Sequence, residues 1–300
     1  MDRTRIDVTR AAAGMVAGQL RYGDFLLGPG TPYRWRKLTG WEELPELDSG
    51  NVPKPDAHGA YLGRLLSQTR TIALDEVIVR APAEQLGGVV EQLGAATGLV
   101  EGELPLLVHI DERGPLLVWA RAVRRTVPVE LGYAVGTVTE AAIEWEASDP
   151  RRYAPAVQQV ETGLPEPCLP WHTTPDGAPR GIPASTGNLT AANLGSAPTH
   201  PVVEVWGPVD TPRITNETTG AVLEYDLILD AGEQLVVDTF AGTAALADGE
   251  SLLHAASVAS WPEQAFVLAP GANELTFRAA DDAPADPRAA AVLRWRSAHW

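Results

Sequence analysis

The stretch that decides the fold runs from Ile143 to Tyr153 and reads Ile-Glu-Trp-Glu-Ala-Ser-Asp-Pro-Arg-Arg-Tyr. Its first half alternates apolar and acidic residues, which is typical of a half-buried β-strand. The strand must stop at Asp149-Pro150, because proline has no N–H to donate to a sheet. Seven prolines follow between Ala154 and Gly187, and they predict a stiff connector between two folding units. We therefore expect a domain at 1–153, a proline-rich linker at 154–187 and a second domain at 188–300.

The composition is that of an acidic globular protein. Hydrophobic residues make up 45% and charged residues 21% of the 300, and the formal net charge is −16. Such a charge argues against nucleic acid as a stably held ligand, because the basic groups that neutralise phosphates are too few. The N-terminal residues lack the long apolar core of a signal peptide, and no stretch has the length of a membrane span. We expect neither stable nucleic-acid binding nor membrane insertion.

The residues that carry chemistry are scattered. Cys168 is the sole cysteine, so an internal disulfide and a multi-cysteine metal site are excluded. The six histidines form no HxH or HxxxH pair, and the nucleotide-binding and nucleophile-elbow motifs are missing. Glu144 and Glu146 would share one side of a strand, as a glycosidase pair could, but solvated acidic strand faces are common. We expect no enzyme activity, no catalytic residue, no metal and no cofactor.

The first half indicates an α+β unit. Short strands are predicted at Tyr22–Leu27 and Tyr33–Leu38, and a longer one at Arg70–Arg80. A helix opens at Pro82, and its apolar residues recur at helical spacing from Leu86 to Leu93. Three more strands are predicted, at 106–111, 116–126 and 136–145. The pattern favours an open sheet or split barrel with one helix packed on it.

A long polar segment with several prolines, from Trp41 to Gly63, interrupts this half. Loops of that length inside a compact domain are usually functional or packed against a partner. The second half reads differently: strands and turns recur every eight to twelve residues, as in an antiparallel sandwich. One strand is predicted over Ala221–Leu229, with its apolar residues from Leu223 onward on a single face.

Three motifs of the first half, in this order, resemble the belt domain of siphophage distal tail proteins. They are Trp41-Glu-Glu-Leu-Pro-Glu-Leu-Asp, Asp56-Ala-His-Gly-Ala-Tyr-Leu-Gly and Arg70-Thr-Ile-Ala-Leu, and the strand that runs into Asp149-Pro-Arg-Arg-Tyr closes the same domain. The second half resembles that family's C-terminal galectin-like sandwich through Asn193-Leu-Gly, Pro201, Gly207, Ile214-Thr-Asn and Gly220.

This resemblance implies a mainly β, structural virion protein rather than a catalyst. It implies a homohexameric ring at the distal end of a long non-contractile tail, assembled in the host cytoplasm. The ring would join the tail tube protein to the tail-tip hub and its fibres, and would enclose a channel for DNA or the tape-measure protein. One subunit patch would lie on the loop Trp41–Gly63 and another on an exposed edge of the belt sheet. The candidate interface residues are Trp41, Leu44, Leu47, His58, Tyr61 and Arg70.

Two other hypotheses stay open. Tryptophans 41, 171, 206, 261 and 300 fall in or near predicted loops and ends. Exposed aromatic rings can stack on sugars, so the C-terminal sandwich could be a carbohydrate-binding module for a cell-wall glycan, with its aromatics on one concave face. A glycan hydrolase is the third hypothesis, and it would need a working pair of acidic residues.

Overall fold

The computed structural model describes residues 7–166, 185–247, 249–280 and 286–300. The chain divides into two compact units, one formed by residues 1–156 with Trp300 and the other by residues 157–299. Strands dominate both, so the expectation of a mainly β chain is confirmed. Cys168, Trp171 and His172 lie outside the described residues.

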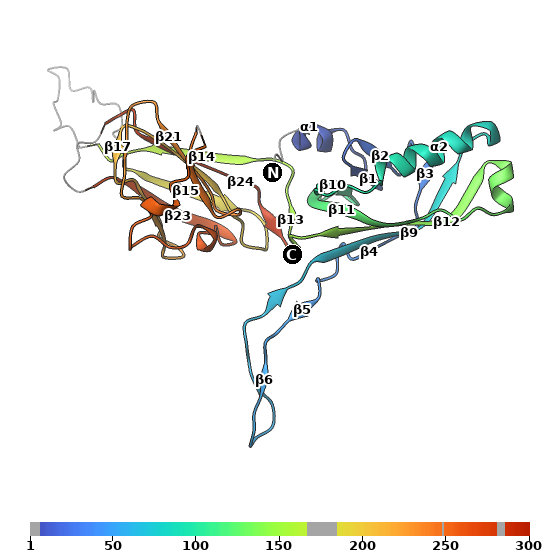
Figure 1. Ribbon diagram of the computed structural model, residues 1–300, viewed down its shortest axis with the longest axis horizontal. Helices are drawn as coiled ribbons and strands as arrows, with labels where there is room; N and C mark the ends of the chain where they lie inside the picture. The colour runs from blue at the N-terminus through green and yellow to red at the C-terminus, as the bar shows by residue number, and fades with distance from the viewer. Residues whose placement is uncertain (1–6, 167–184, 248, 281–285) are drawn as a thin grey trace, which may run out of the picture. The chain divides into compact units, whose positions relative to one another are not determined.

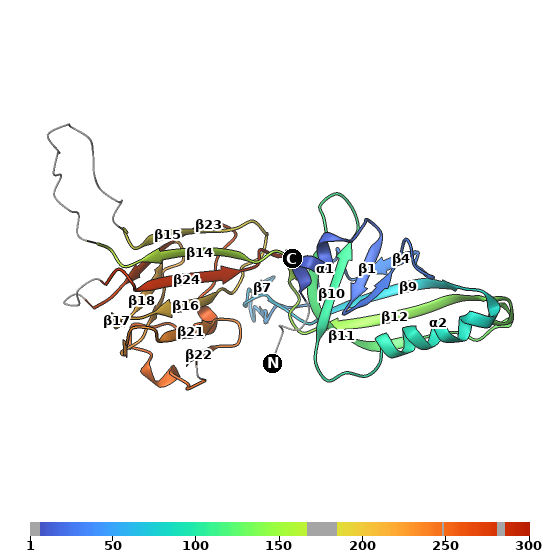
Figure 2. The ribbon, with the colours of Figure 1, turned by 90° about the horizontal axis from the view of Figure 1, so that it is seen from above.

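Unit 1 is built on one antiparallel sheet (Figures 1 and 2). Its strands are β1 (Gln19–Tyr22), β2 (Phe25–Leu27), β3 (Tyr33–Arg34), β4 (Lys37–Thr39), β9 (Arg70–Arg80), β10 (Leu104–His109), β11 (Leu116–Thr126), β12 (Thr137–Ala147) and β13 (Arg152–Tyr153). Their order is β2-β1-β10-β11-β12-β9-β3, while β4 also pairs with β9 and β13 with β11. The expected strand at 143–145 is the buried end of β12, where Ile143 and Trp145 alternate with half-exposed glutamates.

One face of this sheet is closed by helix α2 (Ala83–Ala96). Leu86 and Leu93 of the helix are fully buried against the sheet residues of the same core, among them Ile72 and Trp145. Tyr33 ties the helix to the sheet, because its hydroxyl donates to the Val89 carbonyl at 2.8 Å. Figure 2 shows α2 running alongside β11 and β12.

Two further short elements accompany the sheet. The six-residue helix α1 (Val8–Ala13), which the sequence analysis did not predict, begins where the Asp7 side chain accepts the Arg10 amide. Such capping, followed by three alanines, stabilises a short helix without a long apolar stripe. The 3-10 helix η1 (Leu131–Val135) lies in the connection from β11 to β12.

Unit 2 is a sandwich of two antiparallel sheets with a single apolar core between them. The first sheet has the order β14-β24-β16-β21-β22 and the second the order β15-β23-β18-β19. The strands are β14 (Gln158–Gly163), β15 (Asn188–Asn193), β16 (Val202–Trp206), β17 (Val209–Asp210), β18 (Arg213–Asn216), β19 (Ala221–Glu224), β20 (Ile228–Leu229), β21 (Gln234–Asp238), β22 (Thr243–Leu246), β23 (Gly271–Arg278), β24 (Ala290–Trp295) and β25 (Ala298–His299), with short 3-10 helices at η2 (Leu253–Ala255) and η3 (Glu263–Ala265). The predicted sandwich is therefore present.

Two expectations need correction. The linker predicted at 154–187 was expected to hold no regular element, yet β14 lies inside it and pairs with β24 over its whole length. The prolines of this region flank the short alternating stretch around Val160 rather than interrupting it, so a ladder can form. The strand predicted at Ala221–Leu229 is broken after Glu224, because the Asp226 amide donates to the Ala255 carbonyl instead of to a sheet strand.

Candidate assembly interface

The segment between β4 and β9 is the most exposed part of unit 1, and we call residues 42–69 the arm. It contains β5 (Leu47–Asp48), β6 (Val52–Pro53), β7 (Ala60–Tyr61) and β8 (Leu66–Ser67). The first pairs with the last and the second with the third, so the arm is a long hairpin of two short ladders (Figure 1). Isolated two-stranded hairpins are only marginally stable in water, so packing against another protein surface would stabilise this arm.

Glycines set the shape of the arm at its middle. Between the two ladders, a Cβ on Gly63 would lie 2.3 Å from the Gly50 carbonyl oxygen, a distance that only a hydrogen allows. The Asn51 side chain fixes the same crossing, because its Oδ1 accepts the Gly63 amide at 2.9 Å. The two backbones therefore touch where the hairpin passes from one ladder to the next.

The base of the arm is held by Arg70, a fully buried arginine. Its Nε donates to the Pro150 carbonyl at 2.6 Å, and its Nη1 donates to the carbonyls of Gly40, Trp41 and Glu43 at 2.7, 3.1 and 2.8 Å. Burial lowers the pKa of Arg70 to about 10, with a further contribution from the nearby positive charge of Arg152. One side chain thus joins the start of the arm to the Asp-Pro seam.

A second set of contacts holds the same base from outside. Glu42 accepts from Arg113 at 3.0 Å and lies 3.4 Å from Arg152, whose guanidinium stands over the Trp41 ring. Partial burial opposes the charged form of Glu42, but the hydrogen bonds and positive charges of the two arginines outweigh it and lower the pKa of that carboxyl. Arg113 also bonds Asp111, at 2.7 Å, so the turn after β10 is part of this anchor.

The arm beyond its base exposes apolar side chains. Seven large ones are between 46 and 88% exposed: Leu44, Leu47, Val52, Tyr61, Leu62, Leu65 and Leu66. Scattered exposed apolar residues need no explanation, but a run of seven on one projecting hairpin marks an interaction surface.

The six candidate interface residues from the sequence separate into two groups. Leu44, Leu47, His58 and Tyr61 are exposed on the arm, where an interface could use them. Trp41 and Arg70 are buried and hold the base of the arm instead, so they offer no surface to a partner. An aromatic or a cation in a polar loop does not reveal from sequence which side of the fold it faces. The sequence analysis missed Leu62, Leu65 and Leu66, although three leucines beside a glycine-rich tip were a signal.

A second exposed surface of unit 1 runs from Arg121 to Val135, and we call it the edge segment. It covers the last part of β11 and the η1 connection. Its exposed residues are Arg121, Val123, Arg124, Arg125, Thr126, Val129, Glu130, Leu131, Ala134 and Val135. On one side β11 pairs with β10 only as far as Ala120, so no described strand continues the ladder there.

The face of the sheet opposite α2 carries charged groups, and Arg121 and Arg124 of β11 stand opposite Glu146 and Glu144 of β12. Ile72, Leu74, Ile143 and Trp145 are buried, so the residues between them point away from the core. The acidic residues of β9 and β12 are all outside the core: Asp75, Glu76, Glu140, Glu144 and Glu146. Glu146 is bonded to Arg121 at 3.0 Å, which leaves Glu144 and Glu146 in unequal surroundings. A solvated acidic face describes this pair better than a glycosidase site does.

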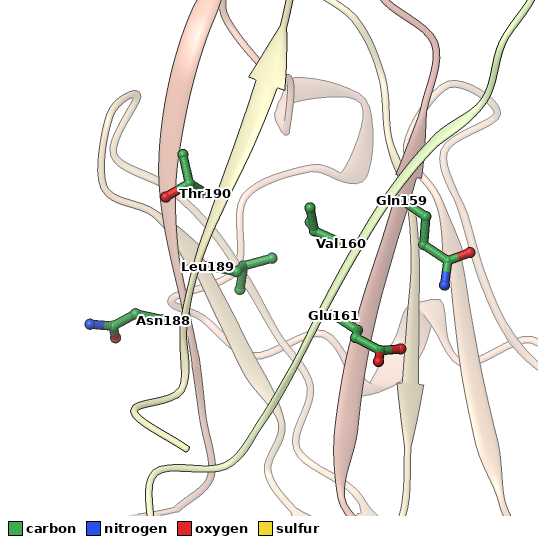
Figure 3. A pocket seen from close by; sticks show the side chains of 6 residues that line it. All are labelled: Gln159, Val160, Glu161, Asn188, Leu189 and Thr190. Atoms are coloured by element: carbon green, nitrogen blue, oxygen red, sulfur yellow. The ribbon is translucent and has the colours of Figure 1, made fainter. Parts of the chain in front are cut away.

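Unit 2 offers a groove of about 520 Å³ where the edge strands β14 and β15 of its two sheets face each other. In Figure 3, Val160 and Leu189 point into the space between the strands, whereas Gln159, Glu161, Asn188 and Thr190 point away from it. The lining has no aromatic ring and no cluster of charges, so it does not have the features of a sugar or metal site.

The exposed tryptophans of unit 2 lie beside different sheets. Trp206 ends β16 in the first sheet, whereas the Trp261 amide donates to Val222 of β19 in the second sheet. The carbohydrate-binding hypothesis predicted exposed aromatics on one concave face, and these two described residues do not meet that condition. Within the described ranges, no group of three or more His, Cys, Asp or Glu could hold a metal ion. No described helix is long and apolar enough to cross a membrane.

Comparison with known proteins finds a family match within unit 2 and a fold match over both units. Residues 194–288 match the model of the siphovirus-type tail component, C-terminal domain. The structure of the SPP1 Dit protein, presented as a paradigm of the hub adsorption apparatus of phages that infect Gram-positive bacteria, is similar with a TM-score of 0.61. The two share 13% identity over 93% of this chain and 98% of that one, a level that shows a common fold.

Two structures of the phage p2 baseplate in its activated conformation are also similar. The one with strontium has a TM-score of 0.50 at 9% identity, over 92% of this chain and 97% of that one. The one with calcium has a TM-score of 0.49 at 10% identity, over 89% and 99%. A search of the curated proteins finds no match.

Proposed function

Taking the chain as a siphophage distal tail protein, as the match over residues 194–288 and the shared fold support, we propose that it forms a homohexameric ring. The ring stands at the distal end of a long non-contractile tail, between the tail tube and the tail-tip hub with its fibres. It is a structural component and conduit without catalytic activity, assembled in the host cytoplasm and carried in the virion.

The observation that carries this proposal is the arm. Seven exposed apolar side chains on a hairpin of two short ladders gain stability only when another surface covers them. The buried Arg70 holds the base of this arm in one pose before any partner arrives, which reduces the entropy lost on docking. A closed ring places such an arm on the neighbouring copy at every subunit.

The acidic face of β9 and β12 supports a channel for DNA. The core and α2 occupy the other face of these strands, so only the acidic one is free to line a lumen. Carboxylates such as Glu144 outnumber the arginines that stand opposite them on β11, so a passing phosphate finds few cations to neutralise it. We propose that this face points into the channel through which DNA or the tape-measure protein passes.

The test is electron microscopy of the purified chain at several concentrations, with native mass measured on the same samples. The proposal expects six-membered rings with a central hole. A triple variant Leu44→Ser, Leu62→Ser, Leu65→Ser is expected to stay monomeric at concentrations where the natural chain forms rings. The control Val258→Ser removes a fully exposed apolar side chain from unit 2 and is expected to keep the rings.

Two results together would contradict the proposal of a ring. If the chain stays strictly monomeric at every concentration and also fails to join a co-expressed tail tube protein, the ring is abandoned. Rings that form only with the tail tube protein present would still support it, because a template can supply the nucleus for closure.

A further inference from the structure

We infer that the groove between β14 and β15 of unit 2 binds an extended, basic segment of another protein, which joins the sandwich as an added strand. Every residue of this groove lies in unit 2, so the contact is independent of the proposed ring. Four features of the groove favour such an occupant: its open strand edges, its lining, the fixed spacing of its two strands and the charge around it.

The two sides of the sandwich differ in how their outermost strands are covered. On one side, the chain returns along β22, where the Leu252 amide donates to the Ala244 carbonyl at 2.8 Å. It then returns along β19, where the Trp261 amide donates to the Val222 carbonyl at 2.8 Å. On the other side, β14 and β15 end their sheets, and no strand in the part of the chain that the structure describes pairs with their outer edges. An uncovered strand edge has free amides and carbonyls and accepts a strand from another chain.

The lining of the groove has the alternation that suits a strand. Its volume is about 520 Å³, which lies in the range of about 300 to 1,000 Å³ found for binding pockets. Val160 of β14 and Leu189 of β15 point into this space, whereas the lining residues next to them point away (Figure 3). An added strand would therefore place every second side chain, an apolar one, between Val160 and Leu189 and turn the others to solvent.

A serine at each end of the groove fixes the spacing of the two strands. Just before β15, the Ser185 hydroxyl donates to the carbonyl of Gly163, the last residue of β14, at 2.9 Å. At the other end, the Ser297 hydroxyl accepts from the Gln158 side chain and from the Leu194 backbone amide, at 2.9 Å each. Leu194 itself is 76% exposed beside this end. A groove whose strands are already held apart loses little entropy when a segment enters it.

The charge of unit 2 favours a basic partner. This unit has a net charge of −12 out of the −16 of the chain, because it contains 18 acidic residues and six arginines. Beside the groove, Glu161 is exposed, and no ion pair of its side chain is found within the described ranges. The arginines of the adjoining strands are already bonded, Arg294 of β24 to Glu204 and Arg278 of β23 to Asn188. Lysine or arginine side chains on the segment would therefore be attracted to this side of the sandwich.

The test is the binding of synthetic peptides to the full chain, measured by isothermal titration calorimetry. Each peptide is about as long as β14, and lysine or threonine alternates in it with valine, leucine or phenylalanine. We expect at least one of these peptides to bind once per chain and to slow the hydrogen exchange of amides in β14 and β15. The amides of β22, which the chain itself covers, are expected to exchange as before.

Two control peptides separate strand addition from simple charge attraction. One has the same composition in an order that breaks the alternation, and the other carries N-methyl groups on alternate backbone amides. Both keep the positive charge of the binding peptide. They are expected to bind at least about tenfold more weakly, because the first loses its apolar face and the second its backbone donors.

Val160→Glu and Gln159→Glu form a matched pair of variants. They add the same charge at neighbouring positions of β14, but only Val160 points into the groove. Val160→Glu is expected to weaken peptide binding at least about tenfold, because the added strand would bury its carboxylate. Gln159→Glu is expected to change the affinity less than about twofold. If Val160→Glu does not fold, the hydrogen exchange of the natural chain and its affinity for the N-methylated peptide decide the question.

Several results would overturn the added strand, and none of them bears on the ring. They are no binding by any of the alternating peptides, equal binding of either control peptide, and unchanged binding to a folded Val160→Glu variant. Slower exchange of the same amides at higher protein concentration without peptide would make a second copy the occupant instead. Binding only after residues 167–184 are replaced by a glycine–serine linker would make that segment of the same chain the occupant.

Discussion

The arm and the sandwich of unit 2 are both built from antiparallel strands, yet they treat apolar side chains in opposite ways. In the sandwich, Leu275 and Phe277 of β23 are buried between two sheets. In the arm, Leu62 and Leu65 face solvent, because a two-stranded ladder has no second layer. The comparison shows that apolar residues of antiparallel strands are buried where a second sheet covers them and stay exposed where none does.

The largest effect should come from a buried aromatic in the core of unit 1. Trp145→Ala is expected to lower the free energy of unfolding of that unit by about 3 to 5 kcal/mol, because it leaves a cavity against Tyr22 and the sheet. Urea unfolding followed by circular dichroism measures it. Trp206→Ala, at an exposed position of unit 2, serves as the control and should change stability by less than about 1 kcal/mol.

The base of the arm should show the next largest effect. Arg70→Met is expected to cost about 2 to 3 kcal/mol, because four backbone carbonyls lose a charged donor inside the fold. Hydrogen exchange of the arm amides should speed up in the same variant. Arg70→Lys keeps the charge but only part of the hydrogen bonding, so its stability should lie between those of the natural chain and Arg70→Met. Unchanged stability in Arg70→Met would mean that the arm does not depend on this anchor.

Substitutions of the exposed residues of the arm should affect stability much less than those of Trp145 and Arg70. Leu62→Ser and Leu65→Ser are expected to change the free energy of unfolding of the monomer by less than about 0.5 kcal/mol, because their side chains are already in water. Their effect should appear in the concentration needed for ring formation, measured by native mass. If either serine variant lowered the free energy of unfolding as much as a core substitution does, these leucines would not be solvent-exposed as the comparison with the sandwich requires.

The last expected effect is a small one that depends on pH. Because the folded pKa of Glu42 is lowered, its contribution to stability is complete above the ordinary value of 4.5 and is lost as the pH falls through the folded value. Glu42→Gln should therefore be less stable than the natural chain by under about 1 kcal/mol at neutral pH, since the pair is half exposed. The difference should shrink below pH 4.5. Thermal unfolding at pH 3 to 7 measures it, and a constant difference would argue against the two arginines as its cause.

The sequence predicted the architecture better than the surfaces. The spacing of the apolar residues predicted the mainly β fold and the helix α2 on the sheet. Burial of one face imposes a spacing of two residues on strands and of three to four on helices. The resemblance to siphophage distal tail proteins is confirmed, while the galectin-like description of the sandwich stays a prediction. The prediction of a linker without regular structure was wrong at β14, because it rested on the number of prolines in the segment and not on their positions.

The candidate site was predicted only in part, and the reason is physical. The segment Trp41–Gly63 was recognised from its length and prolines, but its buried base depends on residues far along the chain. Arg70 donates to the Pro150 carbonyl, and the Arg152 guanidinium lies over the Trp41 ring. An interface on an exposed edge of the sheet was expected, but the sequence did not identify residues 121–135 as that edge. Val123 belongs to β11, where the position at which β10 ends leaves it uncovered, whereas Leu131 and Val135 lie in the 3-10 helix η1, which the sequence analysis did not predict.

The bond from Arg70 to Pro150 also sets an order of events during synthesis. Arg70 leaves the ribosome 80 residues before its acceptor, which is roughly 4 to 16 s at 5 to 20 residues per second. Until the Pro150 carbonyl is made, Arg70 can bond only the carbonyls of Gly40, Trp41 and Glu43, so the base of the arm is not yet joined to the Asp-Pro seam. In the ring proposed above, the arm is therefore expected to take its final position only after unit 1 has been translated to its end.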